Sequence, residues 1–387
     1  MEIFKSYKDN ILNINLKGII NNSKVLELSL LLKDLPSLDT KAIIIDVLKL
    51  SYISKEGLDV LYALKQKVNI PFKIINVSLD IKKLLDEYKL FNEEEIKLLL
   101  RPIDINEANL IGKGSCGECY RIDDKTIVKL YYSNITNKQI EEEQELSKKA
   151  FILGIPTAIS YDIVTYKERK GIIYELIKAK SLTELIRTGK ENIDYYIDVY
   201  AKTCKKIHSC SIKDIILPSY KQIFKNWVLK ISPEYDLYKE SLLKLIDKID
   251  DSKTCIHGDL ITNNIMLYND EGIIIDMGEF SYGNYIFDLA NIVFSLKYVN
   301  AKQDYSDFYG LDTKTLNYIL NELFKKYFNV NDINEIEKIA NSKYIKPLAI
   351  LRYITAYLRD DIDNSSKKEY AKSLLLNELM PFINKNI

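Results

Sequence analysis

The sequence predicts two folded units, an α/β domain over residues 1–100 and an α+β domain over residues 105–387. Two observations support this division. Before Arg101, short apolar strands alternate with amphipathic helical stretches, the order typical of an α/β domain. Beyond it, a few strands are followed by a long run of helices, so we expect a small β-rich lobe at 105–177 and a larger helical lobe at 178–387.

The first unit should contain strands and helices in alternation. Strands are expected from period-two or continuous apolar patterns, and helices from apolar residues that recur every three or four positions. In chain order these segments are the strand Ile11–Leu16, the helix Val25–Lys33, the strand Ala42–Val47, the helix Gly57–Val68, the strand Phe72–Val77 and the helix Leu79–Tyr88.

The second unit should begin with strands that flank one charged helix. In chain order we expect the strand Ala108–Leu110, a glycine-rich turn, the strand Thr126–Tyr132, the helix Lys138–Leu153 and the strands Ala158–Thr165 and Gly171–Ile177. Helices should dominate from Leu182 onward. A tight hairpin is expected to interrupt them, formed by Ile265–Leu267 and Ile273–Ile275.

The composition is that of an ordinary globular protein. Of the 387 residues, 47% are hydrophobic and 28% are charged, so sizeable cores can form. Lys plus Arg and Asp plus Glu both number 55, which does not indicate a general attraction to nucleic acid or to a membrane. No apolar run approaches the roughly 20 residues that span a bilayer, and the N-terminal segment does not look like a signal peptide. Five cysteines, an odd number, favour a reducing compartment, so we expect a cytoplasmic protein.

A glycine-rich turn lies between the first two strands expected in the second unit. Its glycines are Gly112, Gly114 and Gly117, in the pattern G-x-G-x-x-G. Glycines let a loop lie close over phosphate groups and offer backbone N–H donors to them. A strand rather than a helix follows, which disfavours a dinucleotide-binding βαβ unit. An ordinary turn is the alternative. Cys116 and Cys119 have zinc-like spacing, but no second pair accompanies them.

One lysine lies among apolar neighbours in the following strand. If its side chain points inward, Lys129 needs an anionic partner, and a phosphate group or a helix carboxylate would serve. The next helix offers Glu142, Glu143 and Glu145. We choose Glu143, because the apolar residues at nearby helical positions, such as Ala150, would face the core. The alternative is a lysine on the solvent face of the strand.

The last strand of the small lobe ends at Glu175–Ile177. The backbone there could read the edge of an adenine base. A plain strand end with one exposed glutamate is equally compatible with the pattern.

The most specific pattern is an H-G-D run that ends at Asp259. Asn264 follows five residues later, and Asp276 follows twelve residues after that. Phosphoryl transfer needs a carboxylate to orient the attacking hydroxyl and oxygen ligands for Mg²⁺. Asp259 fits the first task, and Asn264 and Asp276 fit the second. The hairpin between them should bring Asp276 back beside Asn264, so we expect an ATP-dependent phosphotransferase.

On these motifs, residues 110–387 resemble the aminoglycoside phosphotransferase and choline kinase family, within the protein-kinase-like fold. The H-G-D-x-x-x-x-N and I-D-x-G runs match closely, and the later F-D-L-A run at 287–290 matches a motif that packs near the active site in that family. The resemblance implies that Asp259 is the catalytic base or orients the hydroxyl. It also implies structural roles for His208 and His257.

The resemblance further implies how ATP and Mg²⁺ would be held. Lys129 would contact the phosphates and pair with Glu143, under the glycine-rich loop. The backbone of Glu175–Ile177 would bind adenine, and Asn264 and Asp276 would hold Mg²⁺.

A protein-serine kinase in a sigma-factor-type switch is the nearest competing function. Ile261 stands two residues after Asp259, where protein Ser/Thr kinases usually carry a lysine. No activation segment or A-P-E-like run follows Asp276. A nucleotide-sensing regulatory protein is another alternative. A protein that only binds the nucleotide would tolerate loss of Asp259, and this chain retains it, which argues against this alternative.

Residues 1–100 resemble the STAS domain, the fold of anti-sigma factor antagonists. The matching feature is the apolar strand Ala42–Val47, followed by a short loop and an amphipathic helix. In that family the loop reads D-S-S-G-L and a serine in it is phosphorylated. Here Ser54 stands at the aspartate place, and Lys55 and Glu56 stand at the two serine places. The resemblance implies a regulatory binding module with a protein partner, without that phosphorylation switch.

The acceptor is expected to be a small molecule. An aminoglycoside, choline, an amino sugar or another metabolite all remain open. Glu279, Asp360 and Asp361 are acidic candidates for binding a cationic substrate. The last two are expected on a late helix, where a solvated pair is the commoner interpretation.

Overall fold

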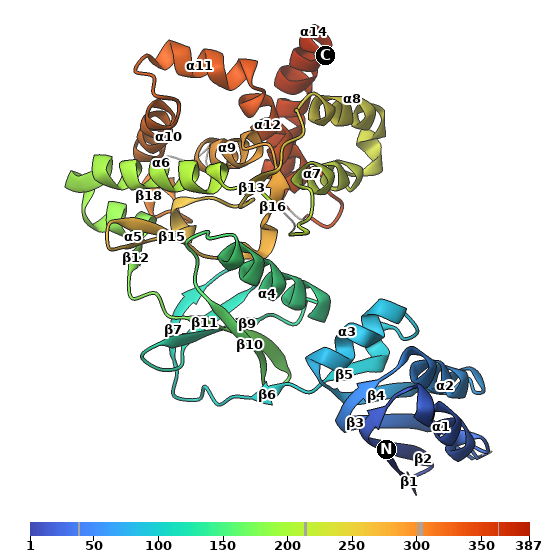
Figure 1. The fold of residues 1–387 in the computed structure, drawn as a ribbon. Coiled ribbons are helices and arrows are strands. Elements are labelled where there is room, and N and C mark those ends of the chain that lie inside the picture. Colours follow the sequence, from blue (N-terminus) through green and yellow to red (C-terminus); the bar gives the residue numbers. More distant parts are fainter. Residues whose placement is uncertain (38, 213–214, 300, 302–304, 363) are drawn as a thin grey trace. The chain divides into compact units, whose positions relative to one another are not determined.

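The computed structural model describes residues 1–37, 39–212, 215–299, 301, 305–362 and 364–387. The chain folds as two compact units, Met1–Ile103 and Asp104–Ile387 (Figure 1). Each unit has a hydrophobic core of its own.

The first unit is a five-stranded sheet with helices between its later strands. The strand order follows the chain, with β1 antiparallel to β2 and the other neighbours parallel. The strands are β1 (Glu2–Lys8), β2 (Ile11–Ile20), β3 (Ala42–Ile53), β4 (Phe72–Val77) and β5 (Ile96–Leu98), and the helices are α1 (Val25–Leu32), α2 (Lys55–Gln66) and α3 (Leu79–Tyr88). A two-residue strand, β6 (Arg101–Pro102), ends the unit.

Alternation of apolar and polar residues places the core on one face of this sheet. Along β2, Leu12, Ile14 and Leu16 are buried, whereas the residues between them are not. The helix after β3, α2, begins at Lys55, two residues before the predicted start at Gly57. The Ser54 hydroxyl caps it by accepting a hydrogen bond from the Gly57 N–H.

The strands and helices expected in the first unit are confirmed, with boundary shifts of a few residues, except that β3 continues beyond Val47 to Ile53. Strand β1 was not predicted. It lies at the sheet edge and is exposed along nearly its whole length, so it lacks the apolar alternation of β2. A signal for it exists in the turn, because Asp9 and Asn10 both adopt positive φ and join the two strands as a tight hairpin.

The small lobe of the second unit is built on an antiparallel sheet. Its neighbouring strands run in the order β10-β11-β9-β8-β7. They are β7 (Asn109–Lys113), β8 (Gly117–Arg121), β9 (Thr126–Tyr131), β10 (Ser160–Tyr166) and β11 (Arg169–Glu175). Strand β8 was not predicted, because a glycine and charged residues interrupt its apolar pattern.

One helix, α4 (Asn137–Ile152), packs on β10 and β11 of this sheet. It begins with a capping box in which Thr136 and Gln139 satisfy each other's backbone N–H groups. Its buried face includes Ile140 and Ala150, and it also includes the charged residue Glu143. The helix contacts the turn Met277–Glu279 of the large lobe as well, so it links the two lobes.

The large lobe is mainly helical. Its helices are α5 (Leu182–Thr188), α6 (Ile193–Ser209), α7 (Tyr220–Leu229), α8 (Asp236–Asp247), α9 (Ile286–Val293), α10 (Thr313–Phe328), α11 (Ile333–Ser342), α12 (Ile345–Tyr357), α13 (Ser365–Leu374) and α14 (Met380–Asn386). Short strands lie among them, namely β12 (Lys180–Ser181), β13 (Thr254–Ile256), β14 (Ile265–Tyr268), β15 (Glu271–Ile274), β16 (Ser281–Gly283), β17 (Tyr305–Ser306) and β18 (Leu311–Asp312).

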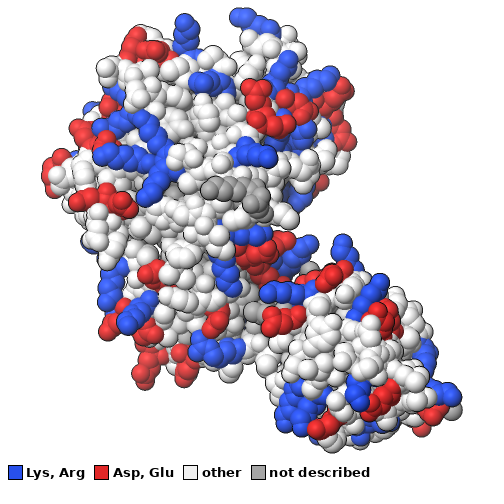
Figure 2. Space-filling view, viewed as in Figure 1, with Lys and Arg blue, Asp and Glu red and all other residues white. Residues whose placement is uncertain are grey.

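The predicted hairpin is confirmed as β14 and β15, which pair antiparallel. Asn269 and Asp270 form its turn, and both have positive φ, as tight hairpin turns require. Figure 2 shows basic and acidic side chains interspersed over the visible face, in keeping with the balanced composition. Within the described residues, no helix has both the length and the apolarity to cross a membrane.

Candidate functional site

A buried ion pair joins strand β9 to helix α4. The Lys129 ammonium nitrogen lies 2.8 Å from Glu143 Oε1, and both side chains are about nine-tenths buried. Glu142 and Glu145 lie on the exposed side of the same helix. The Tyr174 hydroxyl, on β11, donates to the same Glu143 oxygen at 3.1 Å. Lys129 therefore points inward, away from the solvent face that was its alternative position.

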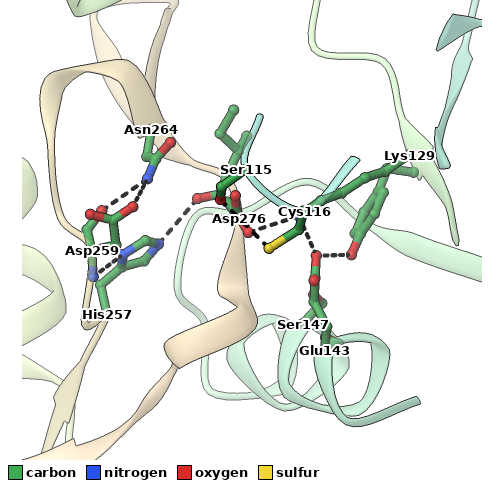
Figure 3. A network of polar contacts seen from close by, with 11 residues as sticks. Ser115, Cys116, Lys129, Glu143, Ser147, His257, Asp259, Asn264 and Asp276 are labelled. Carbon is green, nitrogen blue, oxygen red and sulfur yellow. Dashed lines mark hydrogen bonds and ion pairs between the residues drawn. The ribbon is translucent and has the colours of Figure 1, made fainter. Parts of the chain in front are cut away.

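The same ammonium group also reaches the large lobe. Lys129 Nζ lies 2.9 Å from Asp276 Oδ1, so it bridges two carboxylates (Figure 3). Burial disfavours the charged form of Lys129, but the negative charges of Asp276 and Glu143 outweigh it and raise the Lys129 pKa above its ordinary value. Burial would likewise raise the pKa of Asp276, yet the charge of Lys129 holds it below its ordinary value. Both groups are therefore charged at neutral pH.

Asp259 lies in the loop between β13 and β14, beside Asn264. The Asn264 side-chain amide donates to Asp259 Oδ2 at 2.9 Å and to the Asp259 backbone carbonyl at 3.0 Å. Asp259 is open to solvent on one side, but the surrounding protein partly desolvates its carboxyl group. This burial raises the Asp259 pKa, and the charge of Asp276 raises it further. Figure 3 shows Asp276 between the Asp259–Asn264 pair and the Lys129–Glu143 pair.

His257 is the first residue of this loop and is fully buried. Its Nε2 donates to the Ile275 carbonyl at 3.1 Å, and its Nδ1 accepts from the Asp259 N–H at 3.2 Å. Both ring nitrogens are therefore used to connect the H-G-D loop to the residue before Asp276. This arrangement leaves neither nitrogen to accept a proton from a bound molecule.

A second buried carboxylate holds the backbone of the H-G-D loop. Asp288, in α9, is completely buried and accepts hydrogen bonds from the backbone N–H groups of His257 at 2.9 Å and Gly258 at 2.7 Å. His208 Nε2 donates to it at 3.1 Å. The F-D-L-A run thus supports the backbone immediately before Asp259.

Gly258 is required by its surroundings. Its φ is +87°, and an added Cβ atom would lie 2.6 Å from the Glu279 Cβ. Glu279 therefore packs directly against the H-G-D loop. Its Oε2 atom is buried without a hydrogen-bond partner among the described residues. Burial raises the Glu279 pKa to about 7.

The other two acidic candidates lie elsewhere. Asp360 and Asp361 are exposed and form a turn after α12, not part of a helix, so the expectation of a late helix there was wrong. Asp360 accepts from the Ser232 hydroxyl at 2.5 Å, and Asp361 pairs with Arg359. Both carboxylates are thus engaged with side chains outside the H-G-D loop.

The glycine-rich loop connects β7 and β8, and its glycines have different surroundings. Gly112 and Gly114 have room for a Cβ atom, whose nearest neighbours would lie 4.0 Å away. Gly117 does not, because an added Cβ would lie 2.3 Å from the Leu130 carbonyl oxygen. Cys119 is opposite Lys129 in the β8–β9 register, and burial raises its pKa to about 11, which keeps the thiol protonated.

The strand end that was expected to read adenine closes the small lobe. Glu175 ends β11, so Ile177 lies just outside the strand. The Glu175 N–H donates to the Ile159 carbonyl at 2.8 Å, and the Leu176 N–H donates to the Lys125 carbonyl at 2.7 Å. The described residues provide no acceptor for the Ile177 N–H.

Oxygen atoms dominate the groups that could hold a metal. Asp276, whose φ of +64° is uncommon for an aspartate, offers the carboxylate oxygen that Lys129 does not bind. Asn264 uses its amide nitrogen on Asp259 and retains its amide oxygen. Hard oxygen donors of this kind suit Mg²⁺, which binds proteins through one or two side chains and completes its shell with phosphate and water. No group of three or more His, Cys, Asp or Glu side chains suited to a metal occurs among the residues that the structure describes.

Several residues of this region were not found from the sequence. Tyr174, Asn291 and Arg352 carry no motif of their own. Asn291 lies three residues after Asp288 in α9, and this helical spacing is the one signal that could have placed it on the same face. Its side-chain amide donates to the Gly258 carbonyl at 2.6 Å.

Comparison with known proteins gives a family match. The model of the phosphotransferase enzyme family matches residues 110–310, slightly more than half of the chain. This segment contains the glycine-rich loop, Lys129 and the whole H-G-D hairpin. A comparison with curated proteins finds no match.

Solved structures with similar folds are distant in sequence. The ADP-bound aminoglycoside phosphotransferase APH(2'')-Ib is 18% identical, covers 72% of this chain and 95% of its own, and has a TM-score of 0.47. The ternary complex of APH(2")-IIa with streptomycin and ATP is 16% identical, with 79% and 99% coverage and a TM-score of 0.48. A choline/ethanolamine kinase family protein from Mesorhizobium loti is 12% identical, with 72% and 91% coverage and a TM-score of 0.46.

Proposed function

Because the chain belongs to the phosphotransferase enzyme family, we propose that its second unit transfers the γ-phosphoryl group of ATP to a hydroxyl group of a small molecule. One observation carries the proposal. Lys129, which is held by Glu143, contacts Asp276, and the hairpin that carries Asp276 also carries Asn264 and Asp259. A cation for phosphates and a carboxylate for a hydroxyl are thus assembled at one place.

The proposed reaction assigns one task to each side chain. The acceptor hydroxyl donates a hydrogen bond to Asp259 and attacks the γ-phosphorus. A bond forms between the acceptor oxygen and phosphorus, the bond from phosphorus to the β-phosphate oxygen breaks, and the hydroxyl proton passes to Asp259. The raised Asp259 pKa favours this proton transfer. Lys129 offsets the negative charge of the phosphates.

Asn264 and Asp276 are the proposed ligands of Mg²⁺. When bound, the ion neutralises phosphate charge in reactions of this class. The nucleotide's adenine would use the unpaired Ile177 N–H at the end of the small lobe, next to Glu175. The loop of Gly112, Gly114 and Gly117 would cover the phosphates.

Asp259→Asn tests the proposal. The amide cannot accept the hydroxyl proton, so we expect turnover to fall by at least about 1,000-fold, while the affinity for Mg·ATP stays within about twofold. Steady-state kinetics and calorimetric titration with a non-hydrolysable ATP analogue give the two numbers. Asp270→Asn, at the exposed turn of the same hairpin, is the matched control and should leave turnover unchanged. Wild-type turnover in Asp259→Asn would contradict the role of Asp259.

The acceptor can be found by screening. Full-length protein is incubated with radiolabelled ATP and Mg²⁺ against aminoglycosides, choline, amino sugars, other hydroxylated metabolites and protein partners. Labelling of a small molecule supports the proposed function. Labelling of a protein, or tight ATP binding with no acceptor of any kind, favours the protein-kinase and nucleotide-sensor alternatives respectively.

We also propose that the first unit is a binding module of the STAS type. Its support is the parallel strand β3 followed directly by helix α2, with the Ser54 cap between them. Ser54 is buried and its oxygen caps the helix, whereas Lys55 and Glu56 are exposed in the first turn. Mass spectrometry of the protein after incubation with Mg·ATP should find no phosphate on Ser54. A stoichiometric phosphate there would contradict this interpretation.

A further inference from the structure

One arginine near Asp259 has aromatic neighbours but no carboxylate partner. Arg352, in α12, places its guanidinium carbon 4.1 Å from the centre of the Trp227 ring and 5.2 Å from that of Phe294. All three side chains are half-buried, so they form part of an accessible surface. Among the residues that the structure describes, none supplies an ion-pair partner within 4.0 Å of this guanidinium.

A chain of contacts ties this arginine to the H-G-D loop. The Trp227 ring meets the Tyr220 ring edge-on, with centroids 5.8 Å apart. The Asn291 amide donates to the Tyr220 hydroxyl and to the Gly258 carbonyl, at 2.6 Å in both cases. Tyr220 is completely buried, so this connection is rigid. The aromatic support of Arg352 is therefore fixed relative to Gly258, the residue before Asp259.

The positive charge of Arg352 acts on two carboxyl groups of the site. It opposes the rise in pKa that burial causes at both Asp259 and Glu279. Arg352 is therefore near enough for its charge to act on both carboxyl groups. It forms an ion pair with neither of them, so its guanidinium remains available to another anion. Lys129 is not available in this way, because it already forms ion pairs with Glu143 and Asp276.

We propose that the phosphoryl acceptor is an anionic hydroxyl compound, whose carboxylate or phosphate group is bound by Arg352 while its hydroxyl meets Asp259. This inference rests on the proposed phosphotransferase function and narrows its substrate class. A planar guanidinium stacked on an aromatic ring presents its edge to an anion and matches carboxylate or phosphate geometry with two parallel hydrogen bonds.

A cationic acceptor would face a different balance. Glu279 and Asp259 would attract it, but the unpaired Arg352 would repel it at short range. With Asp360 and Asp361 engaged on the surface, no further described acidic candidate from the sequence compensates for that repulsion. A preference of the protein for a cationic acceptor would therefore contradict the proposal.

Trp227 is the only tryptophan of the chain, so its fluorescence reports directly on the Arg352 site. In the first arm, full-length protein saturated with ADP is titrated with acetate and, separately, with inorganic phosphate, to distinguish the two anion classes. We expect a saturable fluorescence change with one of them below about 50 mM, because a single charge-assisted contact gives affinities near ~1 mM. Arg352→Gln should abolish the change, whereas Arg359→Gln, seven residues further on and already paired with Asp361, should preserve it.

In the second arm, the acceptor screen is scored by charge class, with glycerate, glycerol 3-phosphate and glycerol as a matched set. We expect the preferred acceptor to be anionic, and Arg352→Gln to raise its KM by at least about 30-fold while the KM for ATP stays within about twofold. Arg352→Lys should recover part of the affinity, because it keeps the charge but loses the two-bond geometry. A purely structural role would instead lower the thermal midpoint and change both KM values.

The two arms separate the failure of this inference from the failure of the proposed function. No saturable fluorescence change in the wild-type protein overturns the anion site, whatever the turnover. A preferred cationic or neutral acceptor also overturns it while leaving the phosphotransferase function intact. If anions bind through Arg352 but no hydroxyl compound is phosphorylated, the anion site stands and the proposed function fails.

Discussion

The Lys129 ammonium lies 2.9 Å from the Asp276 carboxylate, although the two residues are 147 positions apart in the chain. This contact joins the small lobe to the large lobe at the proposed phosphate site. Glu143 holds the same ammonium from the side of α4 at 2.8 Å. The triad is therefore both a structural link and a candidate contact for phosphates, and the two roles can be separated by mutation.

Lys129→Met should affect both roles. Removing the ammonium leaves the buried Glu143 carboxylate without a positive partner, which should cost about 3 kcal/mol of stability. Loss of the cation should lower kcat/KM for ATP by at least about 100-fold. The double variant Lys129→Met/Glu143→Leu removes both charges and should regain most of the stability but none of the activity. Thermal midpoints and steady-state kinetics measure the two effects, and recovery of activity in the double variant would contradict the role of Lys129.

In the glycine-rich loop, too, a structural role and a phosphate-binding role can be separated by mutation. An added Cβ at Gly117 would lie 2.3 Å from the Leu130 carbonyl, in the strand that carries Lys129, whereas Gly114 has open space around it. Gly117→Ala should therefore destabilise the protein by about 2 kcal/mol. Gly114→Ala should leave stability within about 0.5 kcal/mol but raise the KM for ATP several-fold, if the loop lies close over phosphates. An unchanged KM in Gly114→Ala would show that the loop is an ordinary turn.

Local sequence patterns predicted most of the candidate site. The hairpin of β14 and β15 follows from its short apolar runs and the Asn269-Asp270 turn, and its register brings Asn264 opposite Ile275. Asp276 is the next residue, so the spacing alone placed it near Asn264. The choice of Glu143 depended on helical periodicity, because only this glutamate shares the buried face of α4.

What the sequence could not indicate depends on contacts between distant elements. Arg352 stacks on Trp227 from α7, and nothing in the residues around either one marks this pairing. The edge strand β1 was missed because an exposed strand has no apolar alternation to reveal it. Asp360 and Asp361 were expected on a helix, whereas α12 ends at Tyr357 and leaves them in a turn.

Asp288 should be essential for the shape of the H-G-D loop. It is fully buried and its two oxygens accept three hydrogen bonds, two of them from the backbone of His257 and Gly258. In Asp288→Asn one oxygen becomes a donor that faces an N–H group, so we expect a loss of about 3 kcal/mol, or a fall in the thermal midpoint of ~6–12 °C for a unit of this size. Thermal unfolding followed by Trp227 fluorescence measures it. Asp251→Asn, on the surface, is the control, and equal midpoints in the two variants would refute this role.

Glu279 should make the second unit less stable as the pH rises. Burial raises its pKa from 4.5 to about 7, and the charges of Asp259, Asp276 and Asp288 contribute to the rise against the opposing charge of Arg352. Between these two pH values the folded state keeps the proton that the unfolded state releases. The free energy of unfolding should therefore fall by about 3 kcal/mol from pH 4.5 to pH 7, and this contribution should be nearly constant at pH values well below 4.5.

Glu279→Gln isolates this contribution, because the amide does not titrate and other ionisable groups remain the same. We expect the difference in unfolding free energy between variant and wild type to grow in favour of the variant across that pH window. Urea unfolding followed by Trp227 fluorescence reports on the second unit alone, since the first unit contains no tryptophan. Glu335→Gln, at an exposed position of α11, should show no such divergence. Parallel pH profiles for wild type and Glu279→Gln would mean that the buried carboxyl group finds a partner in solution.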